Sequence, residues 1–111
     1  MCAMTTLGKR LKELRLAADL SQEQLCIEAG LEPASASARM NRYELGKRAP
    51  DAVTLEKLGE VLNAPAAYFH AASDELAAVI LCFHRLPKAE RIKVKRLLEE
   101  MRPKDEPASF S

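Results

Sequence analysis

The sequence predicts an all-α fold in which five short helices over residues 1–70 are followed by a two-helix extension. Leucine and alanine recur at helical spacing along the chain of 111 residues, whereas no run of Val, Ile or Thr alternates with period two. Proline and glycine fall between the periodic segments, where helices are expected to begin or end. Because the chain has two Tyr, three Phe and no Trp, its core must consist mostly of Leu, Ala, Val and Ile.

The first two helices are marked by their apolar spacing and by their ends. Apolar residues three or four positions apart predict a first helix over about residues 6–18. The sequence Ser21-Gln22-Glu23-Gln24 has the pattern of a capping box and predicts the start of a second helix. Gly30 should end this helix, because glycine readily adopts the positive φ of a helix C-terminus.

Prolines and glycines delimit the next three helices. A third helix is expected from about residue 33 or 35 to residue 45, because proline fits the first turn of a helix, and Gly46 closes it. Asp51 or Thr54 caps a fourth helix, for which Asn63 is the expected stop. Pro65 opens a short fifth helix.

The extension covers residues 71–102. Ser73-Asp74 caps a sixth helix, Pro87 interrupts the chain, and a seventh helix runs over about residues 88–102. Residues 103–111 are polar, contain two prolines and are predicted to be disordered.

The two helices of the extension carry an apolar surface. Its residues are Leu76, Val79, Ile80, Phe83, Ile92, Val94, Leu98 and Met101. This surface either packs on its own domain or, as we expect, mediates a homodimer through residues 74–102. A different protein partner that docks on the C-terminal helices is the remaining alternative.

The composition fits a cytoplasmic protein without a membrane segment. No run of about 18 apolar residues is present, and the N-terminus lacks the basic and apolar regions of a signal peptide. The three cysteines, Cys2, Cys26 and Cys82, are widely separated, so we expect reduced thiols and no metal site. No glycine-rich phosphate loop and no nucleophile beside a histidine is found, so we expect neither an enzyme nor a cofactor.

A joint pattern connects the first seventy residues to a known family. Its members are Leu11, Arg15, Ser21-Gln22, Leu25-Cys26, Ala29-Gly30, Tyr43-Glu44-x-Gly46-Lys47-Arg48-x-Pro50, Leu55, Leu58, Leu62 and Phe69. At these residues the sequence resembles the lambda-repressor-like, Cro-type and Xre-like helix-turn-helix family of transcriptional regulators, over about residues 6–70. The segment Glu-x-Gly-Lys-Arg-x-Pro is the most specific part. The resemblance implies a five-helix domain that binds double-stranded DNA.

The resemblance also assigns structural roles. Arg15 matches a helix-one arginine that pairs with the glutamate ending helix three, here Glu44, although two independent solvated charges are an alternative. Gly30 allows the sharp turn between the second and third helices, and Gly46 closes the third. Cys26 stands where the family keeps a small residue, so that these two helices approach closely.

Phosphate contacts are expected at two places. Gln22 matches a glutamine that, with the N-terminus of helix two, grips a phosphate, although a plain capping role fits the spacing equally well. Lys47 and Arg48 follow the third helix on an exposed loop, where we expect contact with phosphate rather than mere solvation.

Base contacts are expected on the third helix. Counting back from Glu44 places Arg42, Ala38 and Ser37 at base-reading positions, with Arg39 beside them. Arginine suits bidentate contacts to guanine, and small side chains allow close approach to the groove floor. Together with Ser35 near the helix start, the expected DNA-binding residues are Gln22, Ser35, Ser37, Arg39, Arg42, Lys47 and Arg48.

One segment departs from the family's commonest form. Thirteen residues, 31–43, separate Gly30 from Glu44, which is about four more than usual. The extra segment either extends the third helix by one turn or lengthens the turn before it. In the first seventy residues nine basic and nine acidic side chains balance, so the basic character is local to residues 35–48.

We therefore expect a sequence-specific transcriptional regulator, most simply a repressor that binds a near-palindromic operator as a homodimer. Two half-sites would compensate for the low net charge of +1. The alternatives are the antitoxin component of a toxin-antitoxin pair and a protein-interaction module that has lost DNA binding. The basic residues of the third helix and its loop argue against the last.

Overall fold

The computed structural model describes residues 5–103, and in this part of the chain all regular structure is helical. In chain order the elements are α1 (Thr6–Ala17), α2 (Gln22–Glu28), the 3₁₀ turn η1 (Pro33–Ser35), α3 (Ala36–Glu44), α4 (Ala52–Leu62), α5 (Ala66–His70), α6 (Asp74–Arg85) and α7 (Lys88–Met101). The predicted all-α fold of five helices followed by two is confirmed. Cys2 and residues 104–111, most of the tail predicted to be disordered, lie outside the described residues.

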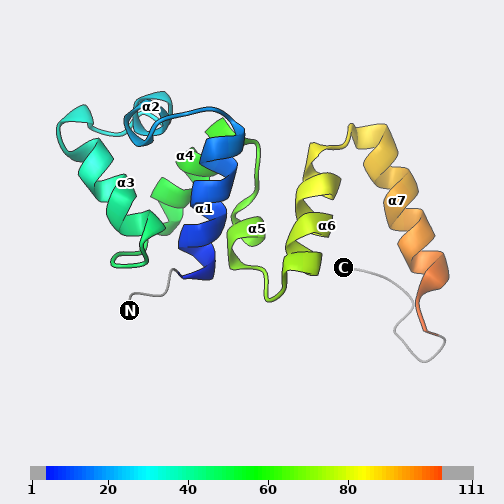
Figure 1. Ribbon diagram of the computed structural model, residues 1–111. Coiled ribbons are helices and arrows are strands. Elements are labelled where there is room, and N and C mark those ends of the chain that lie inside the picture. The colour runs from blue at the N-terminus through cyan, green and yellow to red at the C-terminus, as the bar shows by residue number, and fades with distance from the viewer. Residues whose placement is uncertain (1–4, 104–111) are drawn as a thin grey trace.

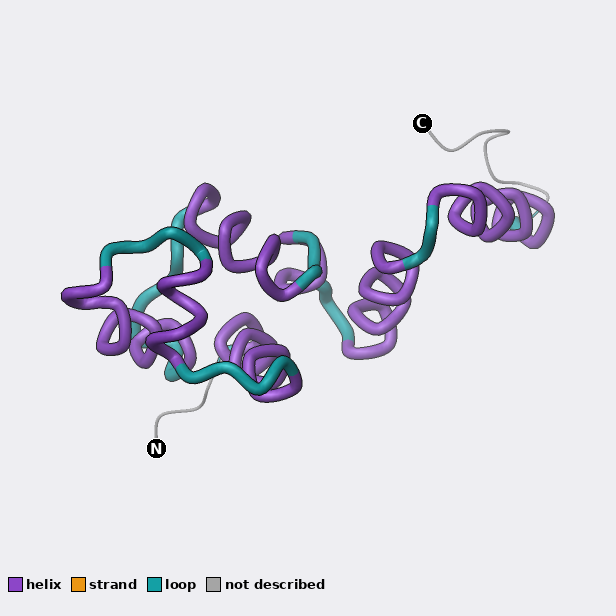
Figure 2. Tube along the Cα trace, turned by 90° about the horizontal axis from the view of Figure 1, so that it is seen from above, coloured by secondary structure: helices purple, strands orange, loops and turns teal. Residues whose placement is uncertain are grey.

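The helices divide into a packed body, formed by α1 to α5, and an arm, formed by α6 and α7. Helices α1 to α5 surround one core, whose fully buried side chains include Leu11, Leu25, Met40, Leu58 and Phe69. Helix α6 packs beside α5, and α7 lies farther out against α6 (Figures 1 and 2). The radius of gyration is 16.4 Å, whereas a compact domain of this length has about 13 Å. The chain is therefore elongated. None of its described helices is long and apolar enough to span a membrane.

Helix ends follow the local sequence closely. The Ser21 hydroxyl accepts from the backbone N–H of Gln24, and the Gln24 side chain accepts from the backbone N–H of Ser21, which completes the predicted capping box. Asp51, and not Thr54, caps α4. Its carboxylate accepts the Thr54 backbone N–H at 2.7 Å, and this hydrogen bond lowers the pKa of Asp51. At the other end of α4, Asn63 adopts a left-handed φ of 52°.

The start of the third helix differs from the expectation. Residues 33–35 form the 3₁₀ turn η1, and the α-helix begins only at Ala36. The four-residue insertion therefore lengthens the turn before α3 and does not add a turn of α-helix. Ser35 is the N-cap residue of α3, but its side chain makes no capping hydrogen bond.

Helix α1 crosses the C-terminus of α3 at Gly8. A Cβ atom on Gly8 would lie 2.5 Å from the carbonyl oxygen of Glu44 and 2.7 Å from that of Tyr43. Although alanine is the better helix former, Gly8→Ala should lower the free energy of unfolding by about 1–3 kcal/mol through overpacking. Urea unfolding of the two proteins measures this change, and a more stable variant would contradict the contact.

One face of α6 packs on the body and another stays open. Ala77 is buried, and Ile80 and Leu81 pack against the core. Leu76 and Val79 on the same helix are about half exposed. The interpretation that the apolar surface packs on its own domain therefore holds for Ile80, whereas Leu76 and Val79 remain exposed to solvent.

Candidate nucleic-acid interface

Helices α2 and α3 pack closely through small and apolar residues. The Cys26 thiol is buried and donates to the carbonyl oxygen of Ala36 at 3.4 Å, at the first residue of α3. Burial raises the pKa of this thiol, so it stays protonated and acts as a small apolar residue. The turn between the helices passes through Gly30, whose φ is +77°. Helix α3 thereby lies across α2 in a helix-turn-helix arrangement (Figure 1).

A buried ion pair ties the C-terminal end of α3 to α1. The guanidinium of Arg15 donates to the Glu44 carboxylate from Nε at 2.6 Å and from Nη2 at 3.0 Å. The two side chains are only 9% and 3% exposed. A third hydrogen bond, from Arg15 Nη1 to the carbonyl oxygen of Leu20, holds the start of α2 to the same arginine. The predicted contact is therefore present, and it fixes α3 against the first helix.

Gln22 does not serve as a helix cap. Capping is carried out by its neighbours Ser21 and Gln24, whereas the Gln22 side chain spans from α2 to α3. Its amide donates to Glu44 Oε1 at 3.2 Å and to Asn41 Oδ1 at 3.4 Å. Gln22 is half-buried, so part of its side chain remains accessible at the N-terminus of α2, where a phosphate contact is expected.

Most of the predicted base-reading residues lie on one exposed face of α3. Ala36, Met40 and Tyr43 point into the core. The opposite side of the helix carries exposed residues at helical spacing, namely Ser37, Ala38, Asn41 and Arg42. Arg39 stands apart from this face, because it is half-buried on the flank of the helix.

Asn41 also lies on this exposed face, although it was not among the residues predicted from the sequence. It lies four residues after Ser37 and three after Ala38, so helical spacing alone places it on the exposed face. The asparagine amide is the side-chain group best suited to contact adenine.

A shallow hollow separates the start of α2 from the start of α3. It is lined by Gln22, Glu23, Ala34, Ser35, Ser37, Ala38 and Asn41. The structure thus brings three of the predicted DNA-binding residues, Gln22, Ser35 and Ser37, to one concave surface. The acidic side chain of Glu23 shares this surface, so the positive charge must come from elsewhere.

That charge lies at the other end of α3. Lys47 and Arg48 are exposed on the loop after Gly46, whose φ is +76°. The backbone N–H groups of both residues donate to the carbonyl oxygen of Arg42, at 2.9 and 3.3 Å. These hydrogen bonds fold the loop back onto the end of α3. The backbones of the three basic residues Arg42, Lys47 and Arg48 therefore lie together.

Comparisons with known proteins agree with this geometry. Residues 6–71 match the family model of the helix-turn-helix domain, over the same stretch as the resemblance seen in the sequence. The crystal structure of the transcriptional regulator BswR is similar, with a TM-score of 0.77 and 40% sequence identity, and the match covers 85% of this chain and 93% of that chain. No curated protein sequence matches significantly. The chain therefore belongs to the helix-turn-helix family of transcriptional regulators.

Proposed function

We propose that this protein is a sequence-specific repressor that binds a near-palindromic operator in double-stranded DNA as a homodimer. The observation that carries the proposal is the exposed face of α3. The buried Arg15–Glu44 pair joins α3 to α1 and so fixes the orientation of this face. In helix-turn-helix proteins the corresponding helix enters the major groove. Occupying an operator is the simplest action of such a module, which is why we propose repression.

Local charge supports contact with the DNA backbone. Between residues 35 and 48, four basic side chains oppose the single carboxylate of Glu44, which Arg15 already neutralises. Each basic residue at the interface releases counterions when it contacts phosphate. Because charges in the first seventy residues balance, one chain would bind weakly, and two chains would double the phosphate contacts.

We propose that the open side of α6 and α7 is the surface on which the second copy docks. Helix α7 has no buried residue, and its side chains Ile92, Leu97, Leu98 and Met101 are all at least 48% exposed. An apolar groove between the two helices is lined by Ala78, Val79, Cys82, Phe83, Leu86 and Val94. Exposed apolar surface of this kind is typical of a protein interface.

The placement of α7 favours a second copy of this chain as the occupant. Helix α7 packs against α6 and buries none of its own residues, so its apolar side is open to the same side of a second copy, as in a symmetric helical bundle.

Selection from a pool of randomised duplexes tests the DNA-binding function. We expect purified protein to enrich an inverted repeat whose half-sites lie about 34 Å apart, one turn of the double helix. Enrichment of a single, unrepeated site would contradict binding as a symmetric dimer. A pool that stays random after several rounds would contradict sequence-specific binding altogether.

The dimer surface is tested by Leu98→Asp. Burial of one leucine contributes about 1.5–3 kcal/mol, and the substitution is present in both chains. The dissociation constant of the variant dimer should therefore be more than about tenfold higher than that of the wild-type dimer. Leu16→Asp on α1 is the matched control, because Leu16 is similarly exposed but lies outside the arm. Light scattering over a dilution series measures both, and a wild-type monomer at high micromolar concentration would contradict the dimer.

A further inference from the structure

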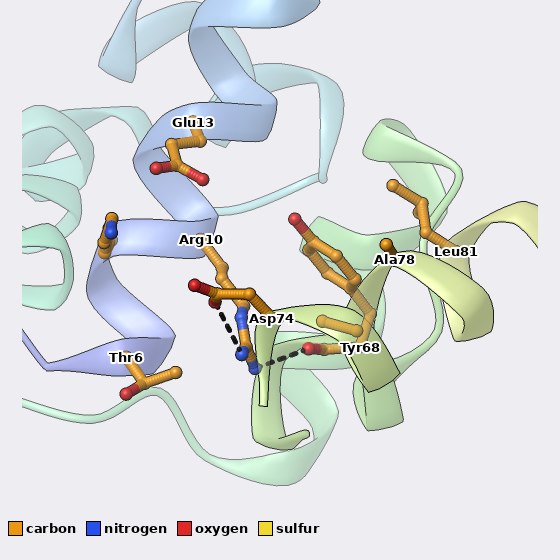
Figure 3. A pocket seen from close by; sticks show the side chains of 9 residues that line it. Thr6, Arg10, Glu13, Tyr68, Asp74, Ala78 and Leu81 are labelled. Carbon is orange, nitrogen blue, oxygen red and sulfur yellow. Dashed lines mark hydrogen bonds and ion pairs between the residues drawn. The ribbon is translucent and has the colours of Figure 1, made fainter. Parts of the chain in front are cut away.

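Arg10 joins α1 to both α5 and α6. This arginine lies inside the body, with only 4% of its surface exposed. Its Nη1 atom donates to the carbonyl oxygens of Tyr68 at 3.0 Å and Ala71 at 2.8 Å, at the C-terminal end of α5. Its Nη2 atom contacts Asp74 Oδ1 at 3.2 Å, at the first residue of α6 (Figure 3). One guanidinium therefore fixes the position at which α6 leaves the body.

Arg85 makes the corresponding connection at the other end of α6. It is the last residue of that helix, and its side chain turns back onto the C-terminus of α4. Nε donates to the carbonyl oxygen of Asn63 at 3.1 Å, and Nη2 donates to that of Leu62 at 3.0 Å. Both carbonyls belong to a helix end, where acceptors lack partners within the helix and favour a cation.

Two attachments fix the direction of a helix as well as its position. Asp74 and Arg85 are eleven residues apart, which corresponds to about 16 Å along an α-helix. Between them, the buried Ala77 and the half-buried Ile80 and Leu81 pack against the body. Helix α6 cannot turn about one end while the other remains attached. Helix α6 therefore forms a rigid connection between the body, which contains α3, and the outer helix α7.

We propose that Arg10 and Arg85 are positioning residues that set the spacing between operator half-sites which the dimer accepts. This inference rests on the proposed homodimer through α6 and α7. If the second copy docks there, the angle between α6 and the body determines how far apart the two α3 helices stand. Neither arginine belongs to the recognition face, and both act through the orientation of α6.

The geometry of DNA makes this spacing a sensitive readout. Inserting one base pair between half-sites moves the second site by about 3.4 Å and rotates it by about 35° around the duplex. A rigid dimer can then bind only one of the two half-sites. It loses the gain in affinity, about 100-fold or more, that simultaneous binding of two linked modules provides. A dimer whose arms pivot would reach both half-sites at several spacings.

The test measures binding to duplexes that carry the selected half-sites at the optimal spacing and with one base pair removed or added. We expect the wild type to prefer the optimal spacing by at least about tenfold. Arg85→Ala and Arg10→Lys should reduce that preference to less than about threefold, mainly by binding the altered spacings better. Lys12→Ala is the control for lost charge, because Lys12 is exposed on α1 and makes no hydrogen bond or ion pair within residues 5–103.

Two companion measurements separate this inference from the function on which it rests. Light scattering measures whether the variant is still a dimer. Titration of a duplex that carries one half-site measures the affinity of a single DNA-binding body for DNA. If both are unchanged in the variants while their spacing preference equals that of the wild type, the role of the arginines is refuted. If the wild type itself is monomeric, the homodimer fails and this inference fails with it. Arg85 is exposed, so Arg85→Ala should remain folded even where Arg10→Lys does not.

Discussion

Replacing Glu44 by alanine should lower the free energy of unfolding by about 3–5 kcal/mol, a large part of the stability of a small domain. The substitution leaves the guanidinium of Arg15 buried without the carboxylate that it contacts at 2.6 and 3.0 Å. It also removes one of the two acceptors of the Gln22 amide, the other being Asn41 Oδ1. The expected loss arises mainly from the unpaired buried charge, and it does not measure a large net stabilisation by the ion pair itself.

A double variant distinguishes these two origins. Replacing Arg15 and Glu44 together by methionine removes both charges. The double variant should therefore lose less free energy of unfolding than Glu44→Ala alone. Glu56→Ala on the exposed side of α4 is the matched control and should stay within about 0.5 kcal/mol of the wild type. Chemical denaturation measures all three variants. A loss below about 1 kcal/mol for Glu44→Ala would show that water still reaches Arg15.

Arg42→Ala should cost about 1–3 kcal/mol of binding free energy on the selected operator and should flatten discrimination at one base position. Arg42 is exposed on the same face of α3 as Ala38 and Asn41. A side chain at this position reaches the base edges if α3 enters the major groove. Its loss should therefore weaken the operator more than a scrambled duplex.

Lys47→Ala is the matched comparison, because Lys47 follows Gly46 on the loop that folds back onto Arg42. A phosphate contact from this loop carries no sequence information. The variant should weaken all duplexes similarly and reduce the slope of affinity against salt by about one unit. Titrations at several salt concentrations separate the two effects. If Arg42→Ala leaves the ratio of affinities unchanged, α3 lies in the groove in a different register.

Features that depend on neighbouring residues could be predicted from the sequence. The capping box at Ser21, the positive φ at Gly30 and the left-handed end at Asn63 each follow from the chemistry of one or a few adjacent residues. The contact between Arg15 and Glu44 spans 29 residues, and it was predicted only because the sequence resembles a known family.

Features that depend on residues far apart were missed. Gly8 looks like an ordinary helix residue until α1 and α3 are seen to cross there. Arg10 and Arg85 look like solvated charges, because most of their acceptors are backbone carbonyls whose position no side-chain pattern reveals, and the carboxylate that Arg10 contacts, Asp74, lies 64 residues away. The insertion before α3 left two outcomes open, and the structure has a 3₁₀ turn there that packs against α2.

We propose that the exposed face of α3 reads the sequence of double-stranded DNA. The most direct test is the affinity of the wild-type protein for the selected operator and for a scrambled duplex of the same composition, measured at physiological salt. We expect the operator to be bound at least about 10³-fold more tightly. Affinities that agree within about threefold would contradict the claim, because phosphate contacts alone do not distinguish the two duplexes.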